Sequence, residues 1–122
     1  MSQPSSLRPR IHSRYPACYT VLVDVEGNRL FATLYEVSFG GAFVHLDFRL
    51  PCGTRITVIA RGSQGQVFAL PAYVRYSCDD ASSPRETRGM GIAWGELSFE
   101  ERAFVMRLVE RAKQGKSLRT MS

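Results

Sequence analysis

Six short runs of β-favouring residues, each followed by turn residues, restrict what this chain can fold into more than any other feature. In the first run an apolar side chain stands at every second position from Tyr19 to Val25, the period of a strand with one buried face. The expected strands are residues 18–25, 30–37, 42–46, 55–60, 67–76 and 88–94. No helical pattern separates them, so we expect an antiparallel barrel or sandwich rather than alternating strands and helices.

Glycine and proline mark the expected turns between these runs. Gly27 and Asn28 should form a tight turn after the first strand, and residues 38–41 end the second. Residues 51–53 and 62–65 interrupt the chain in the same way, and residues 79–86 should form a polar surface loop. Pro71 lies inside the fifth run, which indicates an edge strand or a bulge.

A helix should follow the last strand. Ser98 and Glu101 have the spacing of a capping box, in which each side chain accepts a hydrogen bond from the other residue's amide. The helix should run to about Lys113 and stop at Gly115. Its barrel-facing residues should be Val105, Leu108, Val109 and Ala112.

Two apolar residues of this helix do not fit the barrel-facing stripe. Phe99 and Met106 lie on a partly different face. Either they form a self-association surface, which leaves a homodimer open, or they cover the rim of the barrel.

The charge of the chain comes from arginine. Its 122 residues are typical of one domain, and its net charge of +5 is carried almost wholly by arginine, because Lys113 and Lys116 are the only lysines. Guanidinium forks match phosphates and guanine edges and stack on bases, so an anionic partner is indicated. A basic protein with solvated arginines would have the same composition.

The cysteines and the first residues bear on localisation. Cys18, Cys52 and Cys78 form no CxxC pair, and we expect free thiols in a reducing cytoplasm and no metal site. Residues 1–9 contain no apolar signal core or membrane span. We therefore expect a soluble cytoplasmic protein that does not associate with membranes.

Residues suited to catalysis are scarce. His12 and His45 each lack a nucleophile and an orienting carboxylate in a recognisable motif. No phosphate-binding glycine loop, GxGxxG or zinc signature is present. We expect that the chain is not an enzyme and needs no cofactor.

Arg10 and Arg14 are separated by three residues just before the first strand. Arg107 and Arg111 have the same spacing on the predicted helix, where they should form a solvated surface, so the spacing alone carries no information. The position of Arg10 and Arg14, just before the first strand, is informative. Residues 1–13 read as a flexible basic arm, which could fold two guanidiniums over a ligand on the barrel.

A second motif supports a ligand-binding role for this arm. An acid-x-Ser-x-x-Gly pattern at the end of the second strand comprises Glu36, Ser38 and Gly41. Together with the arginine pair it resembles the PilZ domain family. Tyr15-Pro16 after the arginines, Gly89–Trp94 as a closing strand and the helix after Ser98 agree with this resemblance, which covers residues 8–113.

The resemblance implies a six-stranded antiparallel β-barrel with a C-terminal α-helix over residues 14–113, and a disordered tail at 114–122. It also implies that the chain binds cyclic di-GMP. The implied ligand-binding residues are Arg10, Arg14, Glu36, Ser38, Gly40 and Gly41, with Arg8 and Gly91 as secondary candidates. Glu36 stands where the family usually has Asp or Asn. Its carboxylate can still accept from guanine N1–H and N2–H, one methylene further from the backbone.

Three functions follow as hypotheses. The first is a cyclic di-GMP receptor whose arm becomes ordered on the ligand and which signals in trans to an unidentified protein. The second is a PilZ-like adaptor that does not bind the nucleotide, which Glu36 favours. The third is a barrel that binds single-stranded nucleic acid through Phe31, Tyr35 and Phe39. The strand spacing of these aromatics favours core packing, so we do not expect nucleic acid as a partner.

Overall fold

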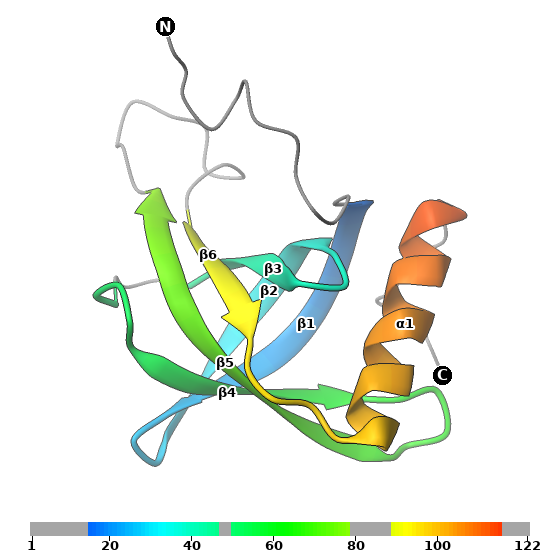
Figure 1. The fold of residues 1–122 in the computed structure, drawn as a ribbon, viewed down its shortest axis with the longest axis horizontal. Coiled ribbons are helices and arrows are strands. Elements are labelled where there is room, and N and C mark those ends of the chain that lie inside the picture. The colour runs from blue at the N-terminus through cyan, green and yellow to red at the C-terminus, as the bar shows by residue number, and fades with distance from the viewer. Residues whose placement is uncertain (1–14, 47–49, 79–88, 116–122) are drawn as a thin grey trace, which may run out of the picture.

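A closed barrel of six antiparallel strands forms the body of the protein (Figure 1). The computed structural model describes residues 15–46, 50–78 and 89–115. Its elements in chain order are β1 (Tyr15–Val25), β2 (Asn28–Val37), β3 (Gly41–His45), β4 (Arg55–Arg61), β5 (Val67–Cys78), β6 (Gly89–Trp94) and α1 (Phe99–Lys113). The strands pair in the order β1-β2-β3-β6-β5-β4, and β4 closes the ring onto β1. The barrel prediction is confirmed, whereas the expected arm, the 79–86 loop and most of the expected tail lie outside the described residues.

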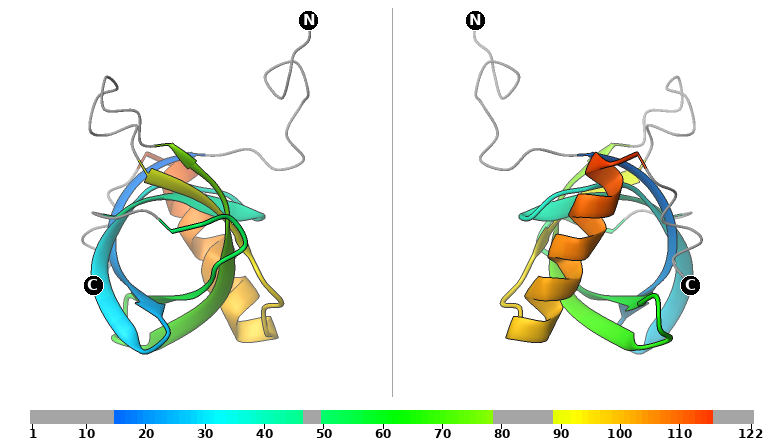
Figure 2. Two further views of the ribbon diagram at one scale, coloured as in Figure 1. Left: turned by 90° about the vertical axis from the view of Figure 1, so that its left-hand side faces the viewer. Right: turned by 90° about the vertical axis from the view of Figure 1, so that its right-hand side faces the viewer.

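The helix α1 lies across one open end of the barrel, which both views of Figure 2 show. Its side chains join the same buried cluster as the inward side chains of the strands. Phe104 is fully buried and its ring stacks on Phe68 of β5, with 4.3 Å between the centroids. The helix residues that face the barrel are Phe104, Val105, Leu108, Val109 and Ala112, which confirms the predicted packing face and adds Phe104 to it.

Two large apolar residues lie on the outer face of α1. Phe99 is 83% exposed and Met106 is 50% exposed. The interpretation that both cover the barrel rim is wrong for Phe99, whereas Met106 is half covered and borders a groove with Ser63 of the β4–β5 turn. Among the described residues, no helix has both the length and the apolar character required to cross a bilayer.

The ends of α1 follow the sequence prediction. The Ser98 hydroxyl accepts from the Glu101 amide at 3.2 Å, and the Glu101 carboxylate accepts from the Ser98 amide at 2.8 Å. Gly115 has φ of 72°, a left-handed conformation that ends a helix.

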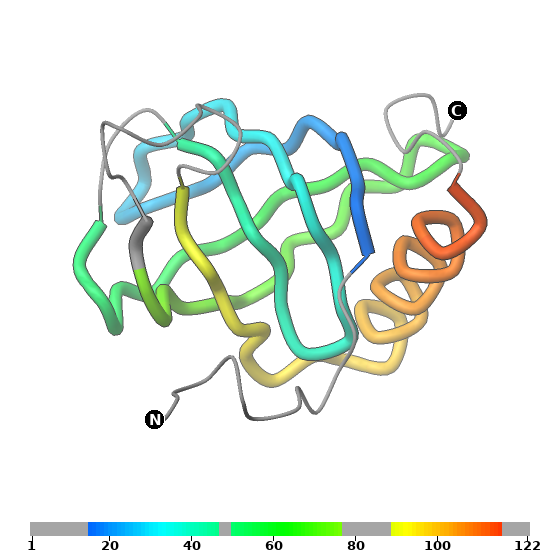
Figure 3. The backbone as a smooth tube through the Cα atoms, turned by 90° about the horizontal axis from the view of Figure 1, so that it is seen from above, coloured from blue at the N-terminus to red at the C-terminus, as the bar shows by residue number. Residues whose placement is uncertain are grey.

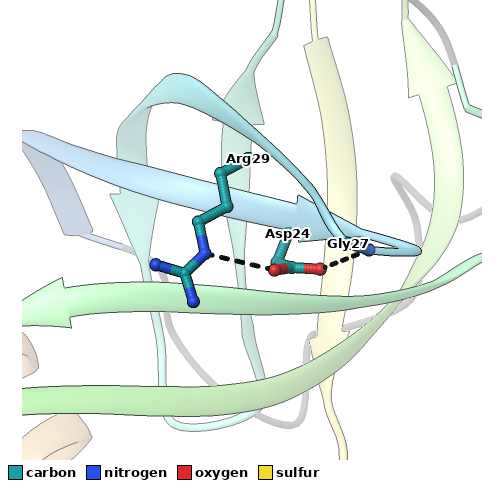
Figure 4. Close-up of polar contacts among 3 residues, drawn as sticks. All are labelled: Asp24, Gly27 and Arg29. Atoms are coloured by element: carbon teal, nitrogen blue, oxygen red, sulfur yellow. Dashed lines mark hydrogen bonds and ion pairs between the residues drawn. The ribbon is translucent and has the colours of Figure 1, made fainter.

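The hairpin between β1 and β2 is shifted by one residue from the prediction (Figure 4). Val25 pairs with Asn28, so the two turn residues are Glu26 and Gly27 rather than Gly27 and Asn28. Both have positive φ, 53° and 89°, as the favoured two-residue hairpin turn requires. Asp24 holds this turn, because its carboxylate accepts from the Gly27 amide at 3.0 Å and pairs with Arg29 at 3.3 Å. This contact offsets the steric cost of a left-handed Glu26.

Two aromatic residues of β2, Phe31 and Tyr35, and Phe39 in the turn after it do not pack in the core. Phe31 is 79% exposed, Phe39 is 43% exposed and Tyr35 is half-buried, so the core-packing interpretation was wrong. Ala32 and Leu34 point inward, and alternation therefore turns Phe31 outward.

Pro71 lies in β5 just beyond the last residue that pairs with β6, so its missing N–H is not needed there. β5 is not an edge strand, because the barrel is closed, and its bulge lies between Val74 and Tyr76 instead. The last β5–β6 pair is Ala72 with Trp94, and the Pro71 carbonyl accepts from Gly95 at 2.7 Å, beyond the end of β6. The ring nitrogen faces that same side, where the ladder requires no further donor.

Candidate ligand-binding site

The sequence-predicted site residues of the barrel gather where β2 turns into β3. Glu36 stands near the end of β2, Ser38 and Gly40 form the turn, and Gly41 begins β3. The start of β1 lies beside them, because Pro16 pairs with Glu36. Arg8, Arg10 and Arg14 precede β1 and lie outside the described residues. The segment that carries them is joined to the barrel directly beside Glu36.

One buried hydroxyl organises the turn. The Ser38 Oγ accepts from the amides of Gly40 at 3.2 Å and Gly41 at 3.0 Å. It also lies 3.2 Å from the Gly41 carbonyl, to which it donates. Ser38 is 4% exposed. In this arrangement the hydroxyl sets the shape of the turn, and the two glycine amides are satisfied within it.

Trp94, the single tryptophan of the chain, fixes the same turn from β6. Its indole Nε1 donates to the Ser38 carbonyl at 3.1 Å, and its backbone amide donates to the Gly40 carbonyl at 3.0 Å. Trp94 is 8% exposed and belongs to the barrel core. The turn is thus tied to the core by two hydrogen bonds.

Gly41 allows β3 and β6 to approach each other closely. The two strands run side by side (Figure 3), and a Cβ atom at position 41 would lie 2.0 Å from the Ile92 carbonyl oxygen. Such a contact is far inside the van der Waals limit, and the clashing atom belongs to the backbone. Gly41 is therefore required for strand pairing at this end of the barrel.

Two β-bulges turn further side chains onto the outer wall. In β2 the register shifts between Leu34 and Glu36, and in β5 it shifts between Val74 and Tyr76. Leu34 and Val74 point into the core, so unbroken alternation would send Glu36 and Tyr76 inward as well. The extra residue at each bulge reverses this phase and puts both side chains on the outside.

The register aligns these side chains across the wall. Glu36 pairs with Phe43, Phe43 with Gly91, and Gly91 with Tyr76, which forms one row over β2, β3, β6 and β5. The next row contains Gly41, Ala93 and Tyr73.

The wall combines small residues with aromatic rings. A Cβ atom on Gly91 would lie 2.2 Å from the Tyr76 ring, so Tyr76 covers the space that the glycine leaves open. Tyr73 is 44% exposed and Tyr76 is 39% exposed. Such a surface can accept a flat aromatic ligand, with polar groups of the turn at its edge.

The sequence prediction named Gly91 of this wall but not Phe43, Tyr73, Tyr76 or Ala93, and it did not anticipate that Trp94 fixes the turn from the core. No motif marks the four wall residues, because their common surface depends on cross-strand register and on the two bulges. The only local signal is the pair Val74 and Tyr76, where the apolar alternation continues although the side chains change face.

Positive charge is present near the start of β1. The Lys113 ammonium in the last turn of α1 lies 5.9 Å from the centroid of the Tyr15 ring, within cation–π range. Tyr15 pairs with Val37, next to the turn. Within residues 15–46, 50–78 and 89–115, no three His, Cys, Asp or Glu side chains gather as a possible metal site.

Comparison with known proteins bears on the fold and the family. The sequence profile of the PilZ domain matches residues 8–111. The PilZ domain of CeSA from a cellulose-synthesizing bacterium has 20% identity and a TM-score of 0.62, over 83% of this chain and 98% of that one. The PilZ domain of YcgR from Escherichia coli, solved with c-di-GMP, has 18% identity and a TM-score of 0.60, over 88% and 94%.

A longer protein has the same fold in one part. MotI/DgrA of Bacillus subtilis, described as an inhibitor of motility, has 22% identity and a TM-score of 0.71 over 89% of this chain and 53% of its own length. No curated protein sequence matches the chain.

The profile covers both the segment with Arg10 and Arg14 and the strands that build the Ser38 turn. The closed barrel has the fold of solved PilZ domains. On these two grounds, the chain belongs to the PilZ domain family.

Proposed function

We propose that this protein is a receptor for cyclic di-GMP and catalyses no reaction. The observation that carries the proposal is the Ser38 turn. It is held rigid by the core, borders a wall of glycine, alanine and tyrosine, and lies where the segment with Arg10 and Arg14 joins the barrel. Family membership and the solved complex of a PilZ domain with c-di-GMP support the same ligand.

Each group has a distinct role in this proposal. Arg10 and Arg14, with Arg8 as a further donor, bind guanine edges and phosphates, and a bidentate arginine on guanine contributes about 1–3 kcal/mol of discrimination. Glu36 accepts from guanine N1–H and N2–H. Ser38, Gly40 and Gly41 keep the turn in shape, and Gly91 leaves room on the wall for the Tyr76 ring. The rings of Tyr73 and Tyr76 offer faces for purine stacking.

Binding also changes the protein in this proposal. The N-terminal arm, residues 1–13, becomes ordered on the ligand, and the bound form presents a new surface to a separate protein in the cytoplasm. The ligand shifts the equilibrium because it binds the protein with an ordered arm more tightly than the protein with a disordered arm. The free energy available for the shift is the difference between these two binding free energies.

Isothermal titration with cyclic di-GMP tests the proposal. The unchanged protein should release heat with saturable binding, and the double variant Arg10→Ala/Arg14→Ala should lose it. The matched control is Arg107→Ala/Arg111→Ala, which removes the same charge at the same spacing from α1 and should bind normally. No heat from the unchanged, folded protein would contradict the proposal.

A competition experiment separates this function from nucleic-acid binding. Phe31 lies on β2 and Phe39 in the turn beyond the end of β2 at Val37. The six residues from Phe31 to Val37 alone span roughly 20 Å, so the two rings do not form one stacking platform. A fluorescent single-stranded oligonucleotide should therefore bind weakly. Tight binding that cyclic di-GMP fails to displace would favour the nucleic-acid barrel instead.

A further inference from the structure

The outer face of α1 carries exposed residues that the barrel does not use. Phe99, Ala103, Met106 and Glu110 are spaced by four, three and four residues, which places them on one stripe of a helix. Phe99 is 83% exposed and Met106 is 50% exposed. In the right-hand view of Figure 2, α1 lies in front of the barrel and no other described element covers it.

A groove runs beside the same stripe. It lies between α1 and the β4–β5 turn and has a volume of about 450 Å³, large enough for an aromatic side chain. Its lining residues are Ser63, Ala103, Met106, Arg107, Glu110, Arg111 and Gln114. The helix thus presents an exposed phenyl ring at its N-terminal end and a hollow towards its C-terminal end.

We infer that this face binds a second copy of the chain, with the two α1 helices antiparallel and a two-fold axis at Met106. Phe99 and Lys113 are each seven residues from Met106, in opposite directions. An antiparallel pair centred on Met106 therefore places Phe99 of each copy at the level of Lys113 and Gln114 of the other, at the end of the groove. A two-fold axis fills both grooves at once.

The charges agree with the same axis. Arg102 and Glu110 are each four residues from Met106, so the antiparallel pair brings Arg102 of one copy opposite Glu110 of the other, twice. Within one chain Glu110 pairs with Lys113 at 3.6 Å and Arg102 donates to the Leu97 carbonyl at 3.2 Å. Both contacts are exposed, and in the dimer the two side chains exchange them for the contact across the axis. A parallel pair would place Glu110 against Glu110. The Arg107 guanidinium carbon lies 6.0 Å from the Phe104 ring centroid, so this side chain folds towards its own helix rather than across the axis.

The dimer should be weak. A face of four helical turns is smaller than the roughly 800 Å² per partner of a standard interface. We expect a dissociation constant of about 0.1 mM, so that dimers form only in concentrated solution or when another contact raises the local concentration.

Sedimentation equilibrium over about 10 μM to 1 mM protein tests the inference, since this range brackets the expected dissociation constant. The unchanged protein should move from monomer to dimer. Phe99→Glu should weaken dimerisation at least about tenfold, because it removes the ring that fills the groove. Phe31→Glu is the matched control, because Phe31 is 79% exposed on the barrel wall and should leave dimerisation unchanged. Circular dichroism confirms that both variants are folded.

A charge exchange tests the axis itself. Arg102→Glu alone and Glu110→Arg alone should each weaken the dimer by bringing like charges together, and the double exchange should restore it. A protein that stays monomeric at about 1 mM, or a dimer that survives Phe99→Glu, overturns the inference. Failure of the double exchange to restore a dimer weakened by both single changes overturns the antiparallel arrangement.

Discussion

At the scale of single residues, Ser38 links the sequence motif to the structure in an unexpected way. Sequence reasoning assigned its hydroxyl to the ligand, since a small residue in that motif could donate to a phosphate or a base. In the structure the hydroxyl accepts from two amides and donates to the Gly41 carbonyl, all within the turn. Its side chain therefore shapes the turn, and in the proposed function it acts on the ligand only through that turn.

Ser38→Ala should lower both stability and ligand affinity. Two amides would lose their shared acceptor, and an unsatisfied buried donor costs about 1–3 kcal/mol. Urea unfolding measures the first effect, and titration with cyclic di-GMP measures the second. Ser38→Thr keeps the hydroxyl and should retain more binding than Ser38→Ala. Equal stability of Ser38→Ala and the unchanged protein would contradict this role.

Gly41→Ala should destabilise the barrel strongly. The added methyl group would meet the Ile92 carbonyl oxygen at 2.0 Å, and the backbone of β6 must move to relieve the clash. We expect a loss of more than about 3 kcal/mol, at the upper end of single substitutions. The control is Gly95→Ala, whose added atom lies 3.3 Å from the Pro71 Cβ. Thermal unfolding should show a larger loss of stability for Gly41→Ala than for Gly95→Ala. The reverse order would contradict the close approach of β3 and β6 at Gly41.

At the scale of elements, alternation predicted the strands well and the bulges not at all. Each strand has an apolar residue at every second position, and this local signal survives in the fold. The bulges of β2 and β5 each add one residue opposite a neighbouring strand. Whether a bulge forms therefore depends on how the two strands pair, which the sequence of one strand does not show. For that reason Tyr76 could not be placed on the outer wall from its own strand. Phe31 was misplaced for another reason, because both faces of β2 carry apolar residues.

Ionisation of Tyr19 in β1 should lower the stability of the barrel at alkaline pH. Burial raises the pKa of its phenol, and the Arg61 backbone and guanidinium lower that pKa by less. A raised pKa means that folding favours the neutral phenol. Only the neutral phenol can donate the hydrogen bond to the Arg61 carbonyl. Stability is therefore fully present below the unfolded pKa of about 10 and is lost as the pH rises through the folded value.

The variant Tyr19→Phe checks this dependence. Urea unfolding between about pH 8 and pH 11 should show a falling free energy of unfolding for the unchanged protein. The slope above about pH 10 should be smaller for Tyr19→Phe. Parallel slopes for the two proteins would show that the Tyr19 phenol does not contribute.

At the scale of the whole molecule, closure of the barrel lay beyond reasoning from the residues alone. Pairing of β1 with β4 joins strands far apart in the chain, and no local pattern distinguishes a closed barrel from a sandwich. The family resemblance supplied that choice and the structure confirmed it. The helix was predicted with its cap, its end and its buried face, because all three signals are local. The roles of Arg10 and Arg14 remain predictions.

Charge should set the salt dependence of ligand binding. The chain has a net charge of +5, and the proposed ligand has two phosphates that Arg10 and Arg14 would neutralise. Raising salt from about 0.05 M to 0.5 M should therefore weaken binding moderately, on the order of tenfold. Arg14→Ala should bind more weakly and with a shallower dependence on salt. Calorimetry at several salt concentrations measures both, and a salt-independent affinity would argue against phosphate contacts.

The most direct test of the central claim is an NMR titration of the labelled protein with cyclic di-GMP. We predict that the amide signals of Ser38, Gly40, Gly41, Gly91 and Tyr76 shift in a saturable way. The opposite wall, with Leu22, Phe31 and Ile59 aligned across β1, β2 and β4, should stay unchanged. Unchanged spectra at saturating ligand, or shifts confined to that opposite wall, would contradict a cyclic di-GMP site at the Ser38 turn.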